Sequence, residues 1–210
     1  MGRPREHDER TRLALLNAAE TRIASGGLDA LSVRAVADDI GSSVRAVYSV
    51  FGSKDGLIRG LAQRGFELLM QEVDSAPITS DPTTDLARAA IFGFRPFALH
   101  HPDLFRLVFV GPDIELDPSA GEASAEAYGR LVARLERARA AGLVPDRPID
   151  ALAMEFHALC QGLASLELCG LMPPGQADQM WADSFDDLIA GWQVRAAAPP
   201  RAKRKRTGGN

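Results

Sequence analysis

The sequence is poor in cysteine and has no long apolar run, and each shortage excludes a class of protein. Only two cysteines, Cys160 and Cys169, occur among 210 residues. Within one helix their nine-residue separation would put them on opposite faces, so we expect no disulfide and a reducing compartment. No apolar stretch approaches the ~18 residues that a membrane-spanning helix needs. The N-terminus is polar rather than secretory in character, and we therefore expect a cytoplasmic protein.

Signatures of enzymes and metal sites are missing as well. The chain contains no Gly-x-Ser-x-Gly, no phosphate-binding loop and no His-Glu-x-x-His. His157, Cys160 and Gln161 would share one helical face, which makes a zinc site conceivable. Glutamine is a poor zinc ligand, however, and no close set of four His or Cys ligands exists. We therefore expect no catalysis, no metal and no other cofactor, and we interpret these side chains as polar positions in a pocket or an interface.

Charge is unevenly distributed along the chain. The formal net charge is −4, yet residues 1–65 carry +2, residues 66–198 carry −11 and residues 199–210 carry +5. A basic N-terminal part on an acidic body would direct one face toward phosphates and keep the rest of the protein off DNA. Lys54 is the only lysine before the C-terminal tail, which indicates a site suited to a compact ammonium group.

Apolar residues recur at helical spacing, and no sustained two-residue alternation predicts a strand. Pro96 is expected to kink or end the helix that begins near Thr83. The predicted helices span about 8–25, 33–40, 44–50, 53–75, 83–97, 101–110, 119–141, 148–171 and 176–197. The sequence thus predicts an all-α fold in three parts. These are a helix-turn-helix domain over 1–58 with a flexible arm at 1–7, a helical regulatory and dimerisation domain over 59–198, and a disordered basic tail over 199–210.

Two short predicted helices, 33–40 and 44–50, are joined by Gly41-Ser42-Ser43. Gly41 can adopt the left-handed backbone conformation that a tight turn needs, and Ala37 is small enough for the helices to cross closely. In a helix-turn-helix the second helix enters the major groove of DNA. Its outer face here carries the short or polar side chains that suit a groove, namely Ser43, Arg45, Ala46, Tyr48 and Ser49. A generic three-helix core is the alternative interpretation.

This segment resembles the DNA-binding domain of the tetracycline-repressor (TetR) family over about residues 8–60. The resemblance lies in Leu31-Ser32-Val33-Arg34-Ala35-Val36-Ala37-Asp38-Asp39-Ile40-Gly41 and Val47-Tyr48-Ser49-Val50-Phe51-Gly52-Ser53-Lys54-Asp55-Gly56-Leu57. In that family Thr or Ser opens the second helix, an aromatic-x-x-Phe closes the recognition helix, and Ser-Lys-x-x-Leu begins the fourth. The sequence departs from the family at Ser42-Ser43-Val44-Arg45, where Val-Ser-x-Gly is more common.

The resemblance implies a DNA-binding regulator in which Tyr48 and Lys54 bind phosphates and Ser32 anchors a phosphate near a helix N-terminus. Arg45 is our candidate for base readout, assisted by Ser43 and Ser49. A solvated or phosphate-bound Arg45 is the alternative, and Tyr48 is also suited to packing between helices. The predicted DNA-contacting set is Arg3, Arg5, Ser32, Arg34, Ser42, Ser43, Arg45, Ala46, Tyr48, Ser49 and Lys54.

Both ends of the chain carry arginines in polar surroundings. Gly2-Arg3-Pro4-Arg5 resembles the core of an A·T-hook, an extended arm that places arginines in a narrow minor groove. A plain disordered terminus is the alternative. The basic tail is open to several interpretations, of which nonspecific attraction to phosphates is one.

Residues 148–171 and 176–197 predict an antiparallel helical hairpin with more apolar surface than one subunit needs. Two hairpins would bury that surface in a four-helix bundle across a twofold axis, and burial within one chain is the alternative. The region resembles a subgroup of TetR-family C-terminal domains marked by Trp-x-x-x-His-Gly, although His157 replaces the tryptophan and Gln161 the histidine. The predicted interface residues are Gly162, Ser165, Trp181, Phe185, Leu188 and Trp192.

A ligand cavity is expected among the predicted helices 53–75, 83–97, 119–141 and 148–171. Apolar walls with His157 and Gln161 as polar groups suit a small apolar effector better than a sugar or a nucleotide. The predicted lining is Phe66, Met70, Phe94, Phe97, Phe105, Phe109, Phe156, His157, Leu159 and Gln161. The alternative is that these phenylalanines only fill the core.

These features together predict a repressor that binds palindromic operator DNA as a homodimer and is released by its effector. The rival hypothesis is a ligand-carrying helical bundle that does not bind DNA. The helix-turn-helix motif counts against that rival.

Overall fold

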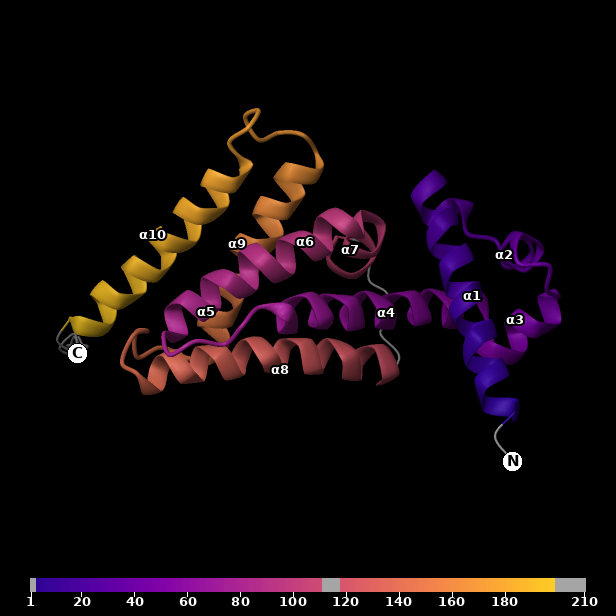
Figure 1. The fold of residues 1–210 in the computed structure, drawn as a ribbon, viewed down its shortest axis with the longest axis horizontal. Helices are drawn as coiled ribbons and strands as arrows, with labels where there is room; N and C mark the ends of the chain where they lie inside the picture. The colour runs from indigo at the N-terminus through magenta and orange to yellow at the C-terminus, as the bar shows by residue number, and fades with distance from the viewer. Residues whose placement is uncertain (1–2, 111–117, 199–210) are drawn as a thin grey trace, which may run out of the picture.

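The computed structural model describes residues 3–110 and 118–198, and within these ranges the chain contains helices and no strand (Figure 1). A 3-10 turn covers Leu28–Ala30, and a π-helical segment covers Ala90–Phe94. The helices are α1 (Arg3–Gly26), α2 (Val33–Asp39), α3 (Val44–Phe51), α4 (Lys54–Ser75), α5 (Pro82–Ala89), α6 (Arg95–His100), α7 (Pro102–Phe109), α8 (Pro118–Ala140), α9 (Ile149–Leu168) and α10 (Ala177–Ala197). The predicted all-α class is confirmed.

Serine side chains cap the N-termini of α3, the candidate recognition helix, and of α4, the helix that follows it. The Ser43 hydroxyl accepts the backbone N–H of Ala46 at 3.2 Å, and the Ser53 hydroxyl accepts that of Gly56 at 2.9 Å. Each bond satisfies a backbone donor that the first turn of a helix leaves without a partner. Ser32 occupies the same position before α2 but makes no such side-chain hydrogen bond, so its hydroxyl remains available to other partners.

The N-terminal arm differs from the prediction. We expected a flexible arm over residues 1–7, whereas α1 begins at Arg3. Pro4 is tolerated in the first turn of a helix, and neither Pro nor Gly follows it before Gly26, so residues with good helix propensity extend α1 upstream. Residues 1–2, the side chains of Arg3 and Arg5, and the tail over 199–210 lie outside the described residues.

Pro96 does not end its helix. The π-helical segment Ala90–Phe94 comes directly before it, and the chain continues through Pro96 as α6 as far as His100. A π-helical turn widens the backbone and re-routes the hydrogen bonds that a proline disrupts. The widened segment lies against α4, because a Cβ atom placed on Gly93 would come 2.7 Å from the Cα atom of Val73.

One long helix, α4, belongs to two parts of the molecule. We call α1, α2, α3 and the first turns of α4 the head, and the remainder the body. Figure 1 shows α1 crossing the end of α4 in the head, and α8 running alongside the rest of α4 in the body. Leu57 and Leu61 of α4 are fully buried in the head, whereas Phe66 and Met70 are buried in the body. The two parts therefore share one continuous helix.

The aromatic rings of α10 face their own chain. Trp181, Phe185 and Trp192 are fully buried in the single subunit. The Trp181 indole donates a hydrogen bond to Glu167 at 2.8 Å, and the Trp192 indole donates one to Glu155 at 3.0 Å. These three rings therefore cannot form the contact surface with a partner that the sequence predicted. Helical spacing shows that they share a face, but it does not show which chain covers that face.

Glycine at position 56 is required by close packing between α3 and α4. A Cβ atom on Gly56 would overlap the carbonyl oxygen of Phe51, whereas one on Gly129, on the exposed side of α8, would meet nothing within 4 Å. We predict that Gly56→Ala lowers the free energy of unfolding by about 1–3 kcal/mol, as overpacking does. The matched control Gly129→Ala should raise it by up to about 1 kcal/mol, the gain in helix propensity. Equal urea midpoints for the two variants would contradict this packing.

Candidate DNA-binding surface and ligand cavity

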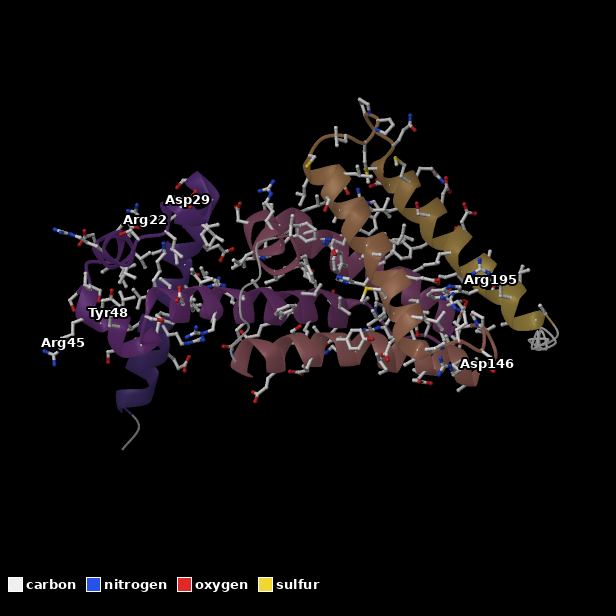
Figure 2. The ribbon with its side chains drawn as sticks, turned by 180° about the vertical axis from the view of Figure 1, so that it is seen from behind. Arg22, Asp29, Arg45, Tyr48, Asp146 and Arg195 are labelled. Atoms are coloured by element: carbon white, nitrogen blue, oxygen red, sulfur yellow. The ribbon has the colours of Figure 1, made fainter. Side chains whose placement is uncertain are left out.

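The outer face of α3 is exposed at the end of the molecule farthest from α10. Arg45 and Tyr48 project from this end of the head in Figure 2, and Val47 on the opposite side of the helix is fully buried. Ser43 and Ser49 are exposed beside them, while Ser42 and Ala46 are half-buried. Within the described part of the chain the Arg45 guanidinium has no ion pair or hydrogen bond. Its donors are therefore free for an external partner.

Further exposed cations lie where neighbouring helices begin. Arg34 stands in the first turn of α2, one residue after the start of the helix at Val33, and Lys54 is the first residue of α4. No carboxylate among the described residues neutralises either side chain. With the exposed Ser32, these groups supply unpaired positive charge and helix N-termini, and both attract phosphate oxygens. The structure thus places the predicted DNA-contacting residues of α2, α3 and α4 on the surface of the head.

An ion pair that the sequence analysis missed fixes α2 against α1. The Nε and Nη2 atoms of Arg22 donate hydrogen bonds to the two oxygens of the Asp39 carboxylate, at 2.6 and 2.7 Å. The hydrogen bonds from Arg22 lower the pKa of Asp39. At the other side of the head, the Arg12 guanidinium lies 5.7 Å from the centre of the Phe51 ring. Contacts between residues so far apart in sequence leave no local pattern, so spacing arguments could not have identified them.

The body contains a cavity of about 310 Å³. It lies among α4, the π-helical segment, α7, α8 and α9. Six of the predicted lining residues border it, and they come from four of these elements: Phe66, Met70, Phe94, Phe109, Phe156 and His157. Four of the six predicted phenylalanines therefore do more than fill the core, because they border a cavity of ligand size.

Four of the predicted lining residues do not border the cavity. Phe97 and Phe105 are fully buried in the core, and Leu159 packs against the edge of that core. Gln161 donates a hydrogen bond to the backbone carbonyl of Phe109 at 2.7 Å, so it fastens the end of α7 instead of offering a polar group to a ligand. The prediction failed here because helical periodicity gives the buried face but not the position of an internal void.

Polar lining from α8 was not predicted. Tyr128, Arg130 and Arg134 border the cavity, together with Ser124 from the same helix. Arg130 and Arg134 are four residues apart and therefore share one helical face with the apolar residues that face α4. This pairing was the available signal, and the sequence analysis interpreted 119–141 only as a helix.

His157 is a polar group surrounded by rings. Its imidazole lies 5.9 Å from the Phe94 ring and 5.1 Å from the Phe109 ring, measured between centroids. Burial lowers the pKa of His157, because removal from water disfavours the charged imidazolium. None of the described residues hydrogen-bonds to the imidazole. The cavity therefore contains a neutral imidazole that is able to donate or accept one hydrogen bond.

An uncharged surface runs along one side of α9, from Met154 at the border of the cavity. Met154 is 62 % exposed and Leu166 is 42 % exposed, and between them Ala158 and Gly162 are exposed at intervals of one helical turn. Ser165 and Leu188 are half-buried, and Leu188 packs against the core of its own chain. We call the four exposed residues of α9 the α9 face. Large exposed side chains on a face without charge are typical of a protein–protein contact.

Neither a metal cluster nor a membrane span is found among the described residues. No group of three or more His, Cys, Asp or Glu side chains there is close enough to hold a metal ion. No helix in the described ranges is both long and apolar enough to cross a bilayer.

Comparison with known proteins agrees with this geometry. A helix-turn-helix head on a helical body is the architecture of a class of transcriptional regulators. Residues 15–61 match the bacterial regulatory proteins of the tetR family, and residues 87–191 match the tetracyclin repressor-like C-terminal domain. The chain belongs to the TetR family of transcriptional regulators, a family of DNA-binding proteins and not of enzymes.

One curated relative and two solved structures are similar to this chain. The uncharacterized HTH-type transcriptional regulator Rv0681 of Mycobacterium tuberculosis is 26% identical over 191 residues, which cover 88% of this chain and 83% of that protein. A protein of unknown function from Rhodococcus sp. RHA1 is 26% identical, with a TM-score of 0.75 over 87% of this chain and 95% of the other. PfmR, a TetR family regulator from Thermus thermophilus, shares the fold at 19% identity, with a TM-score of 0.62 over 84% and 97% of the two chains.

Titration of His157 gives a test of its burial. Because the pKa is lowered in the folded chain, the unfolded chain takes up this proton first as the pH falls, and folding stability decreases below the usual pKa of 6.5. We predict that His157→Phe loses less stability than the wild type between about pH 7.5 and about pH 5.5, measured by urea unfolding. Phe156→Leu changes the cavity without removing a titrating group and should keep the wild-type pH dependence. Identical pH dependence in His157→Phe would show that the imidazole is hydrated.

Proposed function

We propose that the protein is a ligand-responsive repressor that binds palindromic operator DNA as a homodimer. In this proposal a small molecule in the body cavity releases the dimer from DNA. One observation carries the link between the two activities. The first turns of α4 belong to the core of the head through Leu57 and Leu61, and later turns border the cavity through Phe66 and Met70. A change in the shape of the cavity would therefore shift α4, whose first turns are part of the head.

Different residues of the head would have different roles on DNA. Arg45 is exposed on α3 with its donors free, and an arginine in the major groove reads guanine through two parallel hydrogen bonds. Lys54, Arg34 and Tyr48, exposed on α4, α2 and α3, would bind phosphates and set the position of the head on the duplex. Ser43 has a smaller role, because its hydroxyl already caps α3.

Dimerisation through the α9 face would pair the heads. A twofold interface uses the same surface on both subunits, and the α9 face is continuous, exposed and uncharged. This surface keeps Gly162 of the predicted interface and leaves out its α10 rings, which are buried in their own chain. Gly162, at the middle of the face, leaves room for a partner helix to approach closely, because nothing lies within 4 Å of a Cβ atom placed there.

Release from DNA needs a ligand that prefers one arrangement of the heads. A ligand with equal affinity for the DNA-binding and the released arrangement would shift nothing, however tightly it bound. The cavity borders α4 at Phe66 and Met70, so an occupant that displaces these side chains changes the position of α4 and of the head attached to it. Two heads on one twofold axis must stand about 34–36 Å apart to enter adjacent major grooves. A change in that spacing weakens both contacts at once.

The DNA contacts are tested by two substitutions with different signatures. Arg45→Ala should cost about 1–3 kcal/mol at the base that Arg45 reads and relax the preference at that position. Lys54→Ala should weaken binding to all sequences alike and reduce the salt slope by about one unit for each subunit. Fluorescence anisotropy with the operator and its single-base variants, at several salt concentrations, measures both effects.

Arg106→Ala, on the exposed surface of the body, is the control and should leave operator affinity unchanged. If Arg45→Ala kept the relative affinities for all single-base variants, Arg45 would not be the base reader.

The dimer surface is tested by placing a charge where the single chain has room for it. Gly162→Glu should give a monomer in sedimentation velocity and abolish operator binding, because a buried unpaired carboxylate disfavours the interface. The same change at Gly129, which is also exposed in a helix and also has open space around it, is the control and should leave the dimer intact. A Gly162→Glu variant that remains dimeric would place the interface elsewhere.

A further inference from the structure

We propose that the effector is an amphiphilic carboxylate, with its apolar part among the rings of the cavity and its carboxylate bound to Arg134 beside Arg130. This inference rests on the proposed function and adds the chemical class of the ligand. It also replaces the small apolar effector that the sequence predicted. The charge of the lining, the contacts of Arg134 and the polarity of the opposite wall all favour such a ligand.

The charge of the lining is of one sign. Arg130 and Arg134 border the cavity, and no Asp or Glu is found among its described lining residues. The carboxylates of Asp74 and Glu126, which pair with Arg130 at 2.9 and 2.8 Å, are not part of the lining. A ligand in the cavity therefore meets guanidinium groups and no carboxylate.

Arg134 is the less satisfied of the two arginines. Its side chain is only 11 % exposed, and its shortest ion-pair distance is 3.8 Å, to an Asp74 carboxylate that Arg130 already engages at 2.9 Å. Its hydrogen bonds, at 3.3 Å to the Val73 carbonyl and 3.4 Å to the Arg130 carbonyl, are long. A guanidinium has five donors in a planar fork that matches a carboxylate. A carboxylate from the ligand would supply the close partner that Arg134 lacks.

The remainder of the cavity is suited to the apolar part of such a ligand. Phe94, Phe109 and Phe156 line the wall formed by the π-helical segment, α7 and α9. His157 in the same wall is neutral because burial lowers its pKa, so it contributes a hydrogen bond but no charge. Gln161, the other polar group predicted from the sequence, already donates a hydrogen bond to the backbone carbonyl of Phe109. The arginines of α8 are therefore the groups that select the charge of the ligand.

The same geometry connects ligand binding to α4. Val73 and Asp74 belong to the last turns of α4, and Arg134 contacts both. A carboxylate that takes the donors of Arg134 competes with these two contacts. Binding would thus remove contacts between α8 and the body end of α4, the helix whose other end lies in the head.

The test compares ligands that differ only in charge. Isothermal titration calorimetry on the full chain without DNA should show decanoate binding at least about tenfold more tightly than decanol, because hydrogen bonds to charged groups are the stronger ones. Arg134→Met should remove most of this preference and keep the affinity for decanol. Arg106→Met, which changes an exposed arginine outside the cavity, should keep the preference. If Arg134→Met does not fold, Arg134→Gln retains a donor to Val73 without the charge and gives the same comparison.

Three results would overturn the inference: equal affinity for decanoate and decanol, a full preference for decanoate in Arg134→Met, or binding of neither compound. Operator release is measured separately, so that the two proposals fail in different ways. Decanoate that binds through Arg134 but leaves the operator complex intact would contradict the proposed function and not the ligand class. Release by decanol and not by decanoate would overturn the ligand class and leave the proposed function standing.

Discussion

The position of the head depends on the rigidity of a single helix. α4 has 22 residues and is therefore about 33 Å long, and its backbone hydrogen bonds make it stiff along its axis. Leu57 and Leu61 fix one end in the head, and Phe66 and Met70 fix the other in the body. Neither part can shift its own section of α4 without moving the other. In the proposed mechanism, an occupant of the cavity beside this helix would change the geometry of the DNA-binding surface.

Besides α4, an ion-pair cluster connects the head to the body. Glu20 of α1 lies 3.5 Å from Arg64 of α4 and 3.2 Å from His101, which stands between α6 and α7. The carboxylate thus connects three elements at the point where the head meets the body. On the far side of the body, Arg95 and Trp181 both bind Glu167 and hold α10 against α6 and α9. These contacts lie on the two sides of the region that contains the cavity.

Local features of the fold were predictable from sequence because their causes are local. Ser43 and Ser53 begin helices by accepting backbone N–H groups a few residues later, and Gly41 takes the left-handed conformation that its turn needs, with φ of 62°. The start of α1 was misplaced because a charged polar segment has helix propensity as well as the composition of a flexible arm.

Features that depend on distant parts of the chain were not predictable in the same way. Apolar periodicity identified the stripe of Trp181 and Phe185 but could not show that its own chain covers it. The contribution of Arg134 to the cavity depends on how α8 lies against α4, which no pattern within α8 determines. The exposed surface of the head and the aromatic wall of the cavity were therefore available from the sequence, and the arginines of the cavity were not.

In the proposed homodimer, occupancy of the cavity would change the spacing of the two heads. Pulsed electron–electron double resonance measures this spacing directly. The spin label is attached at Asp29→Cys, an exposed position of the head (Figure 2). The background carries Cys169→Ser, and the remaining cysteine, Cys160, is buried. We expect one distance between the labels with operator bound and a different distance after addition of the compound that releases it. The same distance in both states would contradict the proposed mechanism, because release would then occur without any movement of the heads.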